Sequence, residues 1–338
     1  MSEKLRCAMI GLGGRGQHLL RQTLENPHYE VVALAEQSPE LLEKARSMTE
    51  LPPDACYTDL EPAMSAAGVE ACIINTPPQL HAAHLKASFA HDLPAFIAKP
   101  LTRDLAQAQE VVELAEAKKL ALVVDQQQRF RPVEKTLAAW IAEEKYGNLG
   151  FGTYTYHRNR PEMHNSTDEN PFLWEQGVHC FDSLLAMLGR RALTVRSYQM
   201  QPSWSRYNGP TVIMGVIEFE GQTVSSPAVP IQFFGSYASR VRAIELRLEF
   251  EKAAVQIEES TPSRLLVASE NGAFEPVDLS GADARRGEQW NLDNFYRAVR
   301  EGGRVPNDGR ENLRTLAVAD AFIRSRRENR EVAVVDVG

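Results

Sequence analysis

Three glycines follow a short apolar run near the start of the chain. Gly11, Gly13 and Gly16 lie in "CAMIGLGGRGQHLL" with the spacing G-x-G-x-x-G, between a predicted strand and a predicted helix. The first glycine permits a tight turn, the second lets a pyrophosphate approach the backbone, and the third lets the helix pack on the strand. Free N–H groups at the start of the helix would face the anion. The expected dinucleotide contacts span the whole turn: Gly11, Leu12, Gly13, Gly14, Arg15 and Gly16.

Glu36 ends the second predicted strand, at the spacing after Gly16 that a ribose-binding acid requires. Its carboxylate would accept hydrogen bonds from the adenosine ribose, and its charge would repel a 2′-phosphate. The surrounding residues, "AEQSP", include no arginine that could hold such a phosphate. We therefore predict that the cofactor is NAD in preference to NADP.

Two further stretches carry side chains suited to proton transfer. Lys99 directly follows a short apolar strand in "PAFIAKPLT", and Pro100 prevents that strand from continuing. In "LWEQGVHCFD", Glu175 and His179 are four residues apart and share one face of a helix, with Asp182 one turn further. A carboxylate beside an imidazole can orient the ring and tune its pKa for general acid–base work. From these residues alone, a solvated lysine and a helix-surface ion pair are the simpler interpretations.

The elements that must position these residues alternate between strand and helix over the first 125 residues. Strands are expected at residues 5–10, 30–35, 71–74, 95–97 and 120–124. Helices are expected near residues 14–25, 39–48, 59–66, 79–91 and 104–118. Near-continuous apolar strands separated by helices are typical of a doubly wound parallel sheet that is covered on both faces. The sequence therefore predicts a Rossmann-type α/β domain over residues 1–128.

The pattern changes after "DQQQRFRP". Longer runs that alternate polar and apolar residues follow at 152–159, 194–200, 212–220 and 242–251, as expected for a mainly antiparallel, half-covered sheet. Helices are expected near residues 132–144, 172–188, 288–301 and 310–327. Residues 129–338 are thus predicted to form an α+β domain with a large open sheet.

Composition argues against several classes of protein. The chain has 338 residues and a net charge of −8, which does not suit a surface that follows nucleic-acid phosphates. No apolar stretch approaches the roughly 20 residues that span a bilayer, and "MSEKLR" does not resemble a signal peptide. The four cysteines are scattered without metal-ligand spacing: Cys7, Cys56, Cys72 and Cys180. We expect a cytoplasmic protein with reduced thiols, no metal site, and no nucleic-acid or membrane partner.

Taken in order, the motifs resemble one family across nearly the whole chain. "MIGLGGRG" is similar to the opening of the Gfo/Idh/MocA oxidoreductases, named for glucose–fructose oxidoreductase and inositol dehydrogenase. "INTPPQLHAAH", "AKPLTRDLAQAQEVVELAE", "QQQRFRP" and "EQGVHCFD" resemble the segments that follow in that family. "NLDNFYRAVREGG" and "LRTLAVADAFIRSRREN" resemble its C-terminal helices. The order and spacing of these pieces together are more specific than any one of them.

The resemblance implies roles for the proton-transfer residues. Lys99 matches the lysine of the family's "EKP" stretch, which lies beside the nicotinamide and hydrogen-bonds the hydroxyl that becomes a carbonyl. His179 matches the family's general base, and Glu175 takes the place of an aspartate four residues earlier. The chain departs from the family at Glu175, which is one methylene longer, and at Ala98, where the family has glutamate. Asp182 could brace the helix instead of contacting a ligand.

The resemblance also implies binding residues. It places cofactor contacts at Thr76, Pro77, His81 and Lys99. Family members contact substrate near the positions of His157 and Arg158, although a solvated basic loop would explain these residues equally well. Trp174 could stack on a sugar face or anchor its helix in the core.

Three functions follow as expectations. The leading one is an NAD-dependent dehydrogenase that oxidises a secondary hydroxyl of a sugar, cyclitol or sugar derivative. The second is a redox-neutral glycosidase or lyase that oxidises its sugar transiently. It stays an alternative because the chain has Ala98 where the family has glutamate. The third is a non-catalytic NAD-binding sugar sensor, against which the retention of both Lys99 and His179 argues. Because the second sheet is half covered, a homodimer or homotetramer is expected.

Overall fold

The chain divides into two compact units in a computed structural model that describes residues 3–160, 169–223, 226–260 and 262–338. The first unit comprises Met1–Gln127 and Arg285–Leu313, and the second comprises Gln128–Ala284 and Arg314–Gly338. The sequence placed a single boundary after residue 128. Residues 285–313 instead return to the first unit, because the apolar face of their helix packs into its core and not into that of the second.

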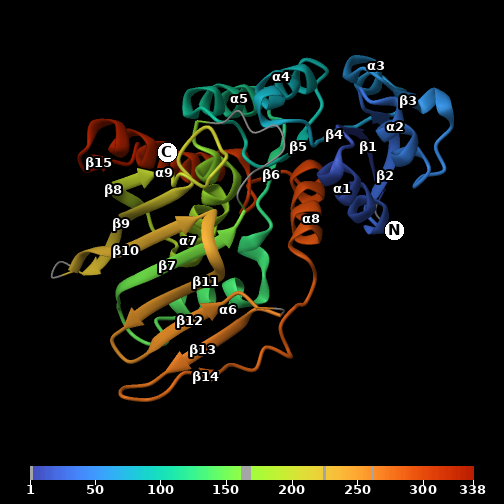
Figure 1. Ribbon diagram of the computed structural model, residues 1–338. Coiled ribbons are helices and arrows are strands. Elements are labelled where there is room, and N and C mark those ends of the chain that lie inside the picture. Colours follow the sequence, from blue (N-terminus) through green and yellow to red (C-terminus); the bar gives the residue numbers. More distant parts are fainter. Residues whose placement is uncertain (1–2, 161–168, 224–225, 261) are drawn as a thin grey trace. The chain divides into compact units, whose positions relative to one another are not determined.

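The first unit is built on a parallel sheet (Figure 1). Within the described residues six strands form it, in the order β3-β2-β1-β4-β5-β6. Their bounds are β1 Leu5–Ile10, β2 Tyr29–Ala35, β3 Cys56–Tyr57, β4 Ala71–Ile74, β5 Ala95–Ala98 and β6 Leu122–Asp125. The reversal of strand order between β1 and β4 defines a Rossmann fold, which confirms the predicted class of the domain.

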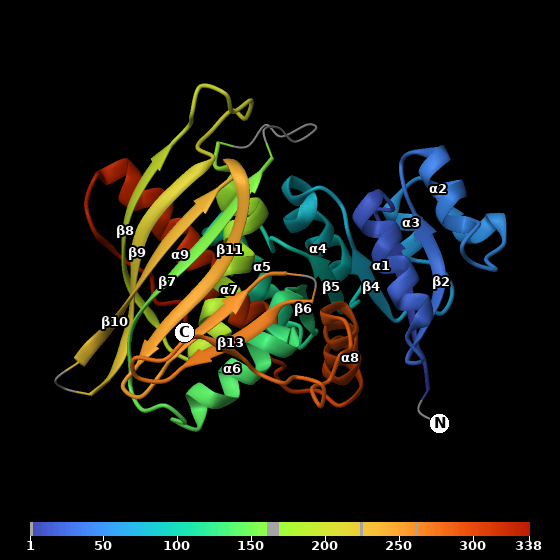
Figure 2. The same ribbon diagram turned by 60° about the horizontal axis from the view of Figure 1, so that its bottom comes forward.

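Helices on both faces cover this sheet. They are α1 Gly14–Glu25, α2 Pro39–Arg46, α3 Leu60–Met64, α4 His81–Ala90, α5 Leu105–Ala117 and α8 Gly287–Arg300, with short 3₁₀ turns at Pro53–Ala55 and Pro78–Leu80. Helix α5 begins where the sequence predicted, because the Asp104 side chain accepts a 2.8 Å hydrogen bond from the N–H of Gln107. Helix α8 lies beside α1 (Figure 2). It buries Leu292 and Phe295 in the core of the first unit.

The second unit contains a larger mixed sheet. Nine strands of the described residues form it in the order β14-β13-β12-β11-β7-β10-β9-β8-β15. Neighbouring strands are antiparallel except β7 and β10, which are parallel. The bounds are β7 Leu149–Asn159, β8 Ala192–Met200, β9 Val212–Thr223, β10 Ser226–Ser236, β11 Ala238–Phe250, β12 Ala254–Glu258, β13 Arg264–Ala268, β14 Glu275–Pro276 and β15 Val332–Ala333.

One face of this sheet is covered by helices. They are α6 Pro132–Ala142, α7 Val178–Leu188 and α9 Gly309–Glu328, with turns at Gln128–Phe130 and Leu173–Gly177. Phe181 of α7 stacks on Phe322 of α9 with ring centroids 4.9 Å apart, and both rings contact Phe233 of β10. Figure 2 shows α7 and α9 beside the sheet. The aromatic contacts fix both helices on it.

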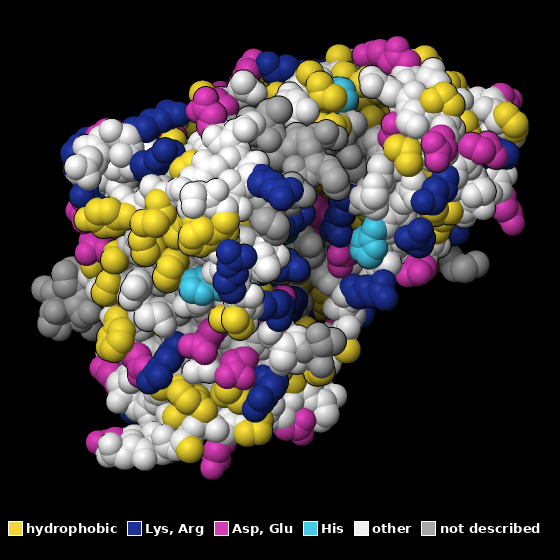
Figure 3. Space-filling view, viewed as in Figure 1, with side chains coloured by type: hydrophobic (Ala, Val, Ile, Leu, Met, Phe, Trp, Pro, Cys, Tyr) yellow, Lys and Arg dark blue, Asp and Glu magenta, His cyan; other side chains and the backbone are white. Residues whose placement is uncertain are grey.

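The opposite face of the sheet carries exposed apolar side chains. Tyr198, Met200 and Val216 point to this face from β8 and β9, and Phe151 does so from β7. They are between 38 and 55% exposed. Figure 3 shows the resulting hydrophobic patch over β8, β9 and β10. We call the surface of these four residues the open face.

Candidate dinucleotide and substrate sites

The glycine turn between β1 and α1 has the geometry that the sequence predicted. Gly11 has φ +82°, and a Cβ atom there would lie 2.8 Å from the carbonyl carbon of Asn75. A Cβ atom on Gly16 would lie 2.1 Å from the carbonyl oxygen of Gly11. Neither position therefore tolerates a side chain. A Cβ atom on Gly13 or Gly14 would meet no described atom within 4 Å, so the turn is open on the side that a phosphate would approach.

The first N–H groups of α1 have no side-chain cap. Gly13 occupies the N-cap position and offers no side chain that could accept from them. Helix N-termini without caps leave backbone donors and a positive dipole end that suit an anion. The turn and helix start thus fit the pyrophosphate of a dinucleotide.

Glu36 lies directly beside this turn. Its Oε2 atom accepts a 2.7 Å hydrogen bond from the N–H of Leu12, and Oε1 accepts a 3.0 Å bond from the N–H of Ser38. The two bonds fix the carboxylate between the glycine turn and the start of α2. This is the place at which an acidic residue meets the adenosine ribose in a Rossmann domain.

The side chain of Arg15 binds carboxylates of the protein itself. Its Nη2 donates to Oδ2 of Asp125, and its Nη1 donates to Oε1 of Glu288 at 3.1 Å. Burial lowers the pKa of Arg15, but the two carboxylates outweigh this effect and leave the pKa above its ordinary value. Asp125 also accepts a 2.8 Å bond from Asn291. The guanidinium of Arg15 therefore links the glycine turn to β6 and α8, a role that the sequence did not predict.

His81 joins the loops that follow β4 and β5. It is fully buried, with Nδ1 2.8 Å from the carbonyl oxygen of Pro100 and Nε2 2.8 Å from that of Thr76. Burial lowers the pKa of His81, although both carbonyl oxygens favour the protonated ring. Both ring nitrogens are thus engaged by the backbone, one of them by the residue that follows Lys99. Thr76 makes a second link through its Oγ1, which lies 2.9 Å from Nδ1 of His84.

Two amide side chains at the same sheet edge were not predicted as site residues from the sequence. Asn75 directly follows β4, and Gln126 follows β6. The amide nitrogen and oxygen of each are buried without a hydrogen-bond partner among the described residues. Because β4, β5 and β6 are neighbours, Asn75, Lys99 and Gln126 follow three adjacent strands. Buried amides of this kind fit a polar ligand such as a nicotinamide carboxamide. Because each comes just after a predicted parallel strand, the sequence could have indicated that they lie at the ligand-binding edge of the sheet.

The segment that carries Glu175 and His179 begins with a wider helical turn than expected. Leu173–Gly177 is π-helical, and α7 starts only at Val178. His179 and Trp174 are almost completely buried, at 5 and 7% exposure. The carboxylate of Glu175 pairs with Arg160, whose Nη1 lies 3.3 Å from Oε1. Single π turns are frequent at functional sites.

Asp182 is bound from two sides within the second unit. Its carboxylate accepts hydrogen bonds of 2.8 and 2.6 Å from Nε and Nη2 of Arg129, and a third of 3.2 Å from the hydroxyl of Thr315. Asp182 and Arg129 are both buried. The contacts attach α7 to the turn at residues 128–130 and to α9, which is the bracing arrangement that the sequence left open.

His157 and Arg158 point to opposite faces of β7. The ring of His157 packs edge-on against Phe234, with centroids 4.4 Å apart, on the side of the open face. Arg158 donates a 3.3 Å bond to the hydroxyl of Tyr156, whose ring meets Phe172 on the helical side. The structure therefore does not bring these two predicted substrate contacts together.

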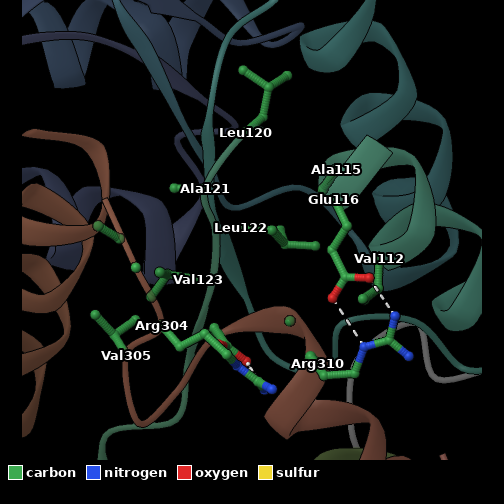
Figure 4. A pocket seen from close by; sticks show the side chains of 14 residues that line it. Val112, Ala115, Glu116, Leu120, Ala121, Leu122, Val123, Arg304, Val305 and Arg310 are labelled. Atoms are coloured by element: carbon green, nitrogen blue, oxygen red, sulfur yellow. Dashed lines mark hydrogen bonds and ion pairs between the residues drawn. The ribbon is translucent and has the colours of Figure 1, made fainter. Parts of the chain in front are cut away.

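A separate cavity of about 140 Å³ lies at the other end of β6 (Figure 4). Leu120, Leu122 and Val112 form apolar walls, and Arg310 pairs with Glu116 at its side. Leu120 precedes β6 and Leu122 begins it, so the cavity lies at the amino end of this strand, whereas the glycine turn and Lys99 follow the carboxyl ends of theirs. Ligands of open α/β sheets bind at the carboxyl ends of the strands, so this cavity is not part of the dinucleotide site.

No helix in the described part of the chain combines the length and apolar character that crossing a membrane requires. Within the same residues, no group of three histidine, cysteine or acidic side chains is arranged to hold a metal ion.

Two family profiles together match most of the chain. The profile described as "Oxidoreductase family, NAD-binding Rossmann fold" matches residues 5–126, and "Oxidoreductase family, C-terminal alpha/beta domain" matches residues 141–334. The chain therefore belongs to the Gfo/Idh/MocA oxidoreductase family, as its motifs indicated, and its first domain is an NAD-binding Rossmann domain.

Individual relatives are distant. Inositol 2-dehydrogenase of Corynebacterium glutamicum is 25% identical over 260 residues, which cover 76% of this chain and 74% of the relative. Aldose–aldose oxidoreductase from Caulobacter crescentus, solved with glycerol, superposes with a TM-score of 0.87 at 17% identity, covering 98% of this chain and all of that one. Levoglucosan dehydrogenase, solved with NADH and L-sorbose, gives a TM-score of 0.81 at 18% identity, covering 99% of this chain and all of that one.

Proposed function

We propose that this oxidoreductase uses NAD to oxidise a secondary hydroxyl of a sugar, cyclitol or sugar derivative. One observation carries the proposal. Gly11 packs against Asn75 at the end of β4, and the neighbouring strand β5 ends directly before Lys99. A lysine thus follows the same edge of the sheet as the dinucleotide turn, where a cation could act on a hydroxyl next to the cofactor.

Separate groups of residues would bind the cofactor and act on the substrate. The glycine turn and the uncapped start of α1 would bind the pyrophosphate, Glu36 the adenosine ribose, and the loops at Thr76–Pro77 and Lys99 the nicotinamide end. When bound, the nicotinamide accepts a hydride. The ammonium of Lys99 would hold the substrate hydroxyl, and the imidazole of His179 would take its proton. Glu175 would tune His179 from the preceding turn.

The preference for NAD over NADP rests on Glu36. Its carboxylate is fixed by the N–H groups of Leu12 and Ser38. A ribose hydroxyl can donate to such a carboxylate, whereas a 2′-phosphate would meet its charge at close range. No arginine adjoins Glu36 in the sequence to compensate.

The proposed substrate class draws on the relatives. Inositol 2-dehydrogenase and levoglucosan dehydrogenase act on polyhydroxylated rings by their names. A redox-neutral glycosidase or lyase remains the second candidate, because Ala98 stands directly before Lys99 where the family has glutamate. That change removes a carboxylate near Lys99 and the proposed cofactor site.

We also propose a homodimer or homotetramer formed through the open face of the second sheet. Phe151, Tyr198 and Met200 are at least half exposed there. Apolar patches of this kind on a sheet commonly mark an interface.

The test is a panel of polyols, aldoses and cyclitols incubated with the purified protein and NAD. Accumulation of NADH with an oxidised product supports net dehydrogenation. A changed sugar without net NADH supports the redox-neutral alternative. Dinucleotide and sugar binding without any product would favour a sensor and overturn both enzymatic proposals.

A further inference from the structure

Four arginines gather where β7 ends and β11 begins, within the second unit. Ala238 pairs with Asn159 and Ala243 with His157, so the four residues from 239 to 242 face the single residue Arg158. An expansion of this kind bends a strand and re-aims its side chains. It sets Arg240 and Arg242 next to the end of β7. We call Arg158, Arg160, Arg240 and Arg242 the basic corner.

The basic corner has more positive than negative charge. Arg160 pairs with Glu175 at 3.3 Å, and Arg242 pairs with Glu259 at 3.4 Å. The partners of the other two arginines are aromatic: Arg158 donates to the hydroxyl of Tyr156, and the guanidinium of Arg240 lies 5.4 Å from the centre of the Trp204 ring. No carboxylate of the described residues lies within ion-pair distance of either. Two guanidinium groups thus retain donors for an anion.

Aromatic residues beside the corner suit a sugar. The indole N–H of Trp204 donates a 3.0 Å bond to the carbonyl oxygen of Ala238, which fixes the ring, yet Trp204 is 51% exposed. Tyr237 is 1% exposed, and its hydroxyl has no hydrogen-bond partner among the described residues. Burial and the nearby Glu175 raise the pKa of Tyr237, so its hydroxyl stays protonated and can donate. A stacking surface and an unused buried donor are what a hydroxylated ring would use.

The corner is joined to the proposed catalytic segment. Arg160 contacts the Tyr237 ring, with 5.5 Å from its guanidinium carbon to the ring centre, and also binds Glu175. Glu175 lies four residues before His179 and is the residue at which the chain departs from the family's aspartate. A ligand group held by the basic corner would therefore lie next to Glu175, on the segment that carries His179.

We infer that the substrate is an anionic sugar, with a carboxylate or phosphate bound by Arg158 and Arg240, its ring stacked on Trp204 and one of its hydroxyls bonded by the hydroxyl of Tyr237. The inference rests on the proposed function and narrows its substrate class. Guanidinium groups bind carboxylate and phosphate through paired, charge-assisted hydrogen bonds. A neutral sugar would leave both guanidinium groups without an anion.

The experiment compares matched ligands that differ only in charge. Binding of the gluco, galacto and manno hexuronates, of the corresponding hexoses and of their 6-phosphates to the protein with NADH is measured by calorimetry. Turnover with NAD is measured for the same set. The charged member of at least one series should bind about tenfold tighter or more, the scale of one charge-assisted hydrogen bond. The anion is identified by which of the two, the uronate or the 6-phosphate, shows the larger increase in affinity over the neutral hexose.

Arg158→Gln and Arg240→Gln should each reduce this preference for the charged ligand severalfold. Arg247→Gln is the matched control, because Arg247 is an exposed arginine further along β11 that pairs with Glu249. It should leave the preference unchanged. If no charged ligand binds tighter than its neutral counterpart, or if the preference survives both corner variants, the inference is overturned. Tight anion binding without turnover would instead refute the proposed oxidation and leave the inference standing.

Discussion

The carboxylate of Glu36 accepts a 2.7 Å hydrogen bond from the backbone N–H of Leu12, so the acid at the end of β2 is held against the glycine turn. Any dinucleotide bound to that turn must place its adenosine ribose near this charge. We expect Glu36→Ala to weaken NAD binding and to raise the ratio of NADP to NAD affinity by about tenfold, which corresponds to roughly 1.4 kcal/mol. Fluorescence titration with NADH and NADPH measures both.

Glu40→Ala is the control for this variant, since Glu40 is an exposed acid in the first turn of α2. It should change neither affinity. Wild-type protein that binds NADP as tightly as NAD would contradict the assignment of the cofactor.

The buried imidazole of His81 should make stability depend on pH. Its pKa in the folded protein is lowered, whereas the unfolded chain titrates near pH ~6.5. Below ~6.5 the unfolded chain binds a proton that the folded protein does not, so the free energy of unfolding falls as the pH falls towards the folded pKa. His81→Gln should be less stable near neutral pH and should lose less stability on acidification. Urea unfolding of both proteins at about pH 7.5 and 5.5 tests this, and parallel losses would refute it.

The pair of Asp182 and Arg129 predicts a large loss of stability when one partner is removed. Asp182→Asn leaves the guanidinium buried without its carboxylate, which costs about 3–5 kcal/mol. Glu249→Gln removes an exposed pair with Arg247 and should cost at most about 1 kcal/mol. Denaturant unfolding gives both values. Similar small losses in the two variants would mean that Asp182 does not brace α7.

The open face predicts an oligomer. Val216 lies on β9 within this face and is 38% exposed. Val216→Arg should disrupt the proposed dimer or tetramer and reduce the mass of the assembly, because an interface core does not accommodate an unpaired charge. Leu24→Arg alters an exposed apolar residue of α1 and should leave the assembly intact. Light scattering that shows monomeric wild-type protein at micromolar concentration would defeat the prediction.

Features set by neighbouring residues were predictable from the sequence. The glycine turn follows from the steric needs of Gly11 and Gly16, and both closely packed positions are found in the structure. Five strands of the first sheet are mostly buried, near-continuous apolar runs, and the sequence predicted each of them. The sixth, β3, was missed because it has only two residues, both half buried. Glu36 lies at a fixed distance along the chain from the turn that it contacts.

Features that depend on contacts between distant parts of the chain could not be predicted from the sequence. The sequence analysis missed β10, because Pro227 and Pro230 argue against an internal strand. In the structure β10 nevertheless lies between β7 and β9. β12, β13 and β14 were also missed, because short strands outside a clear alternating pattern carry little local signal. The partners of Arg15 follow it by more than a hundred residues, so nothing near Arg15 distinguishes a phosphate contact from an internal ion pair.

The central claim is that Lys99 acts on the hydroxyl that is oxidised, and the turnover of Lys99→Ala tests it most directly. With the best substrate of the panel, the rate of NADH formation should fall by about 10² or more, while NAD binding, which depends on the glycine turn, is retained. Lys86→Ala removes an exposed lysine that pairs with Glu110 and should not change the rate. Turnover of Lys99→Ala close to that of the wild type would show that Lys99 is an ordinary lysine and would contradict the proposed chemistry.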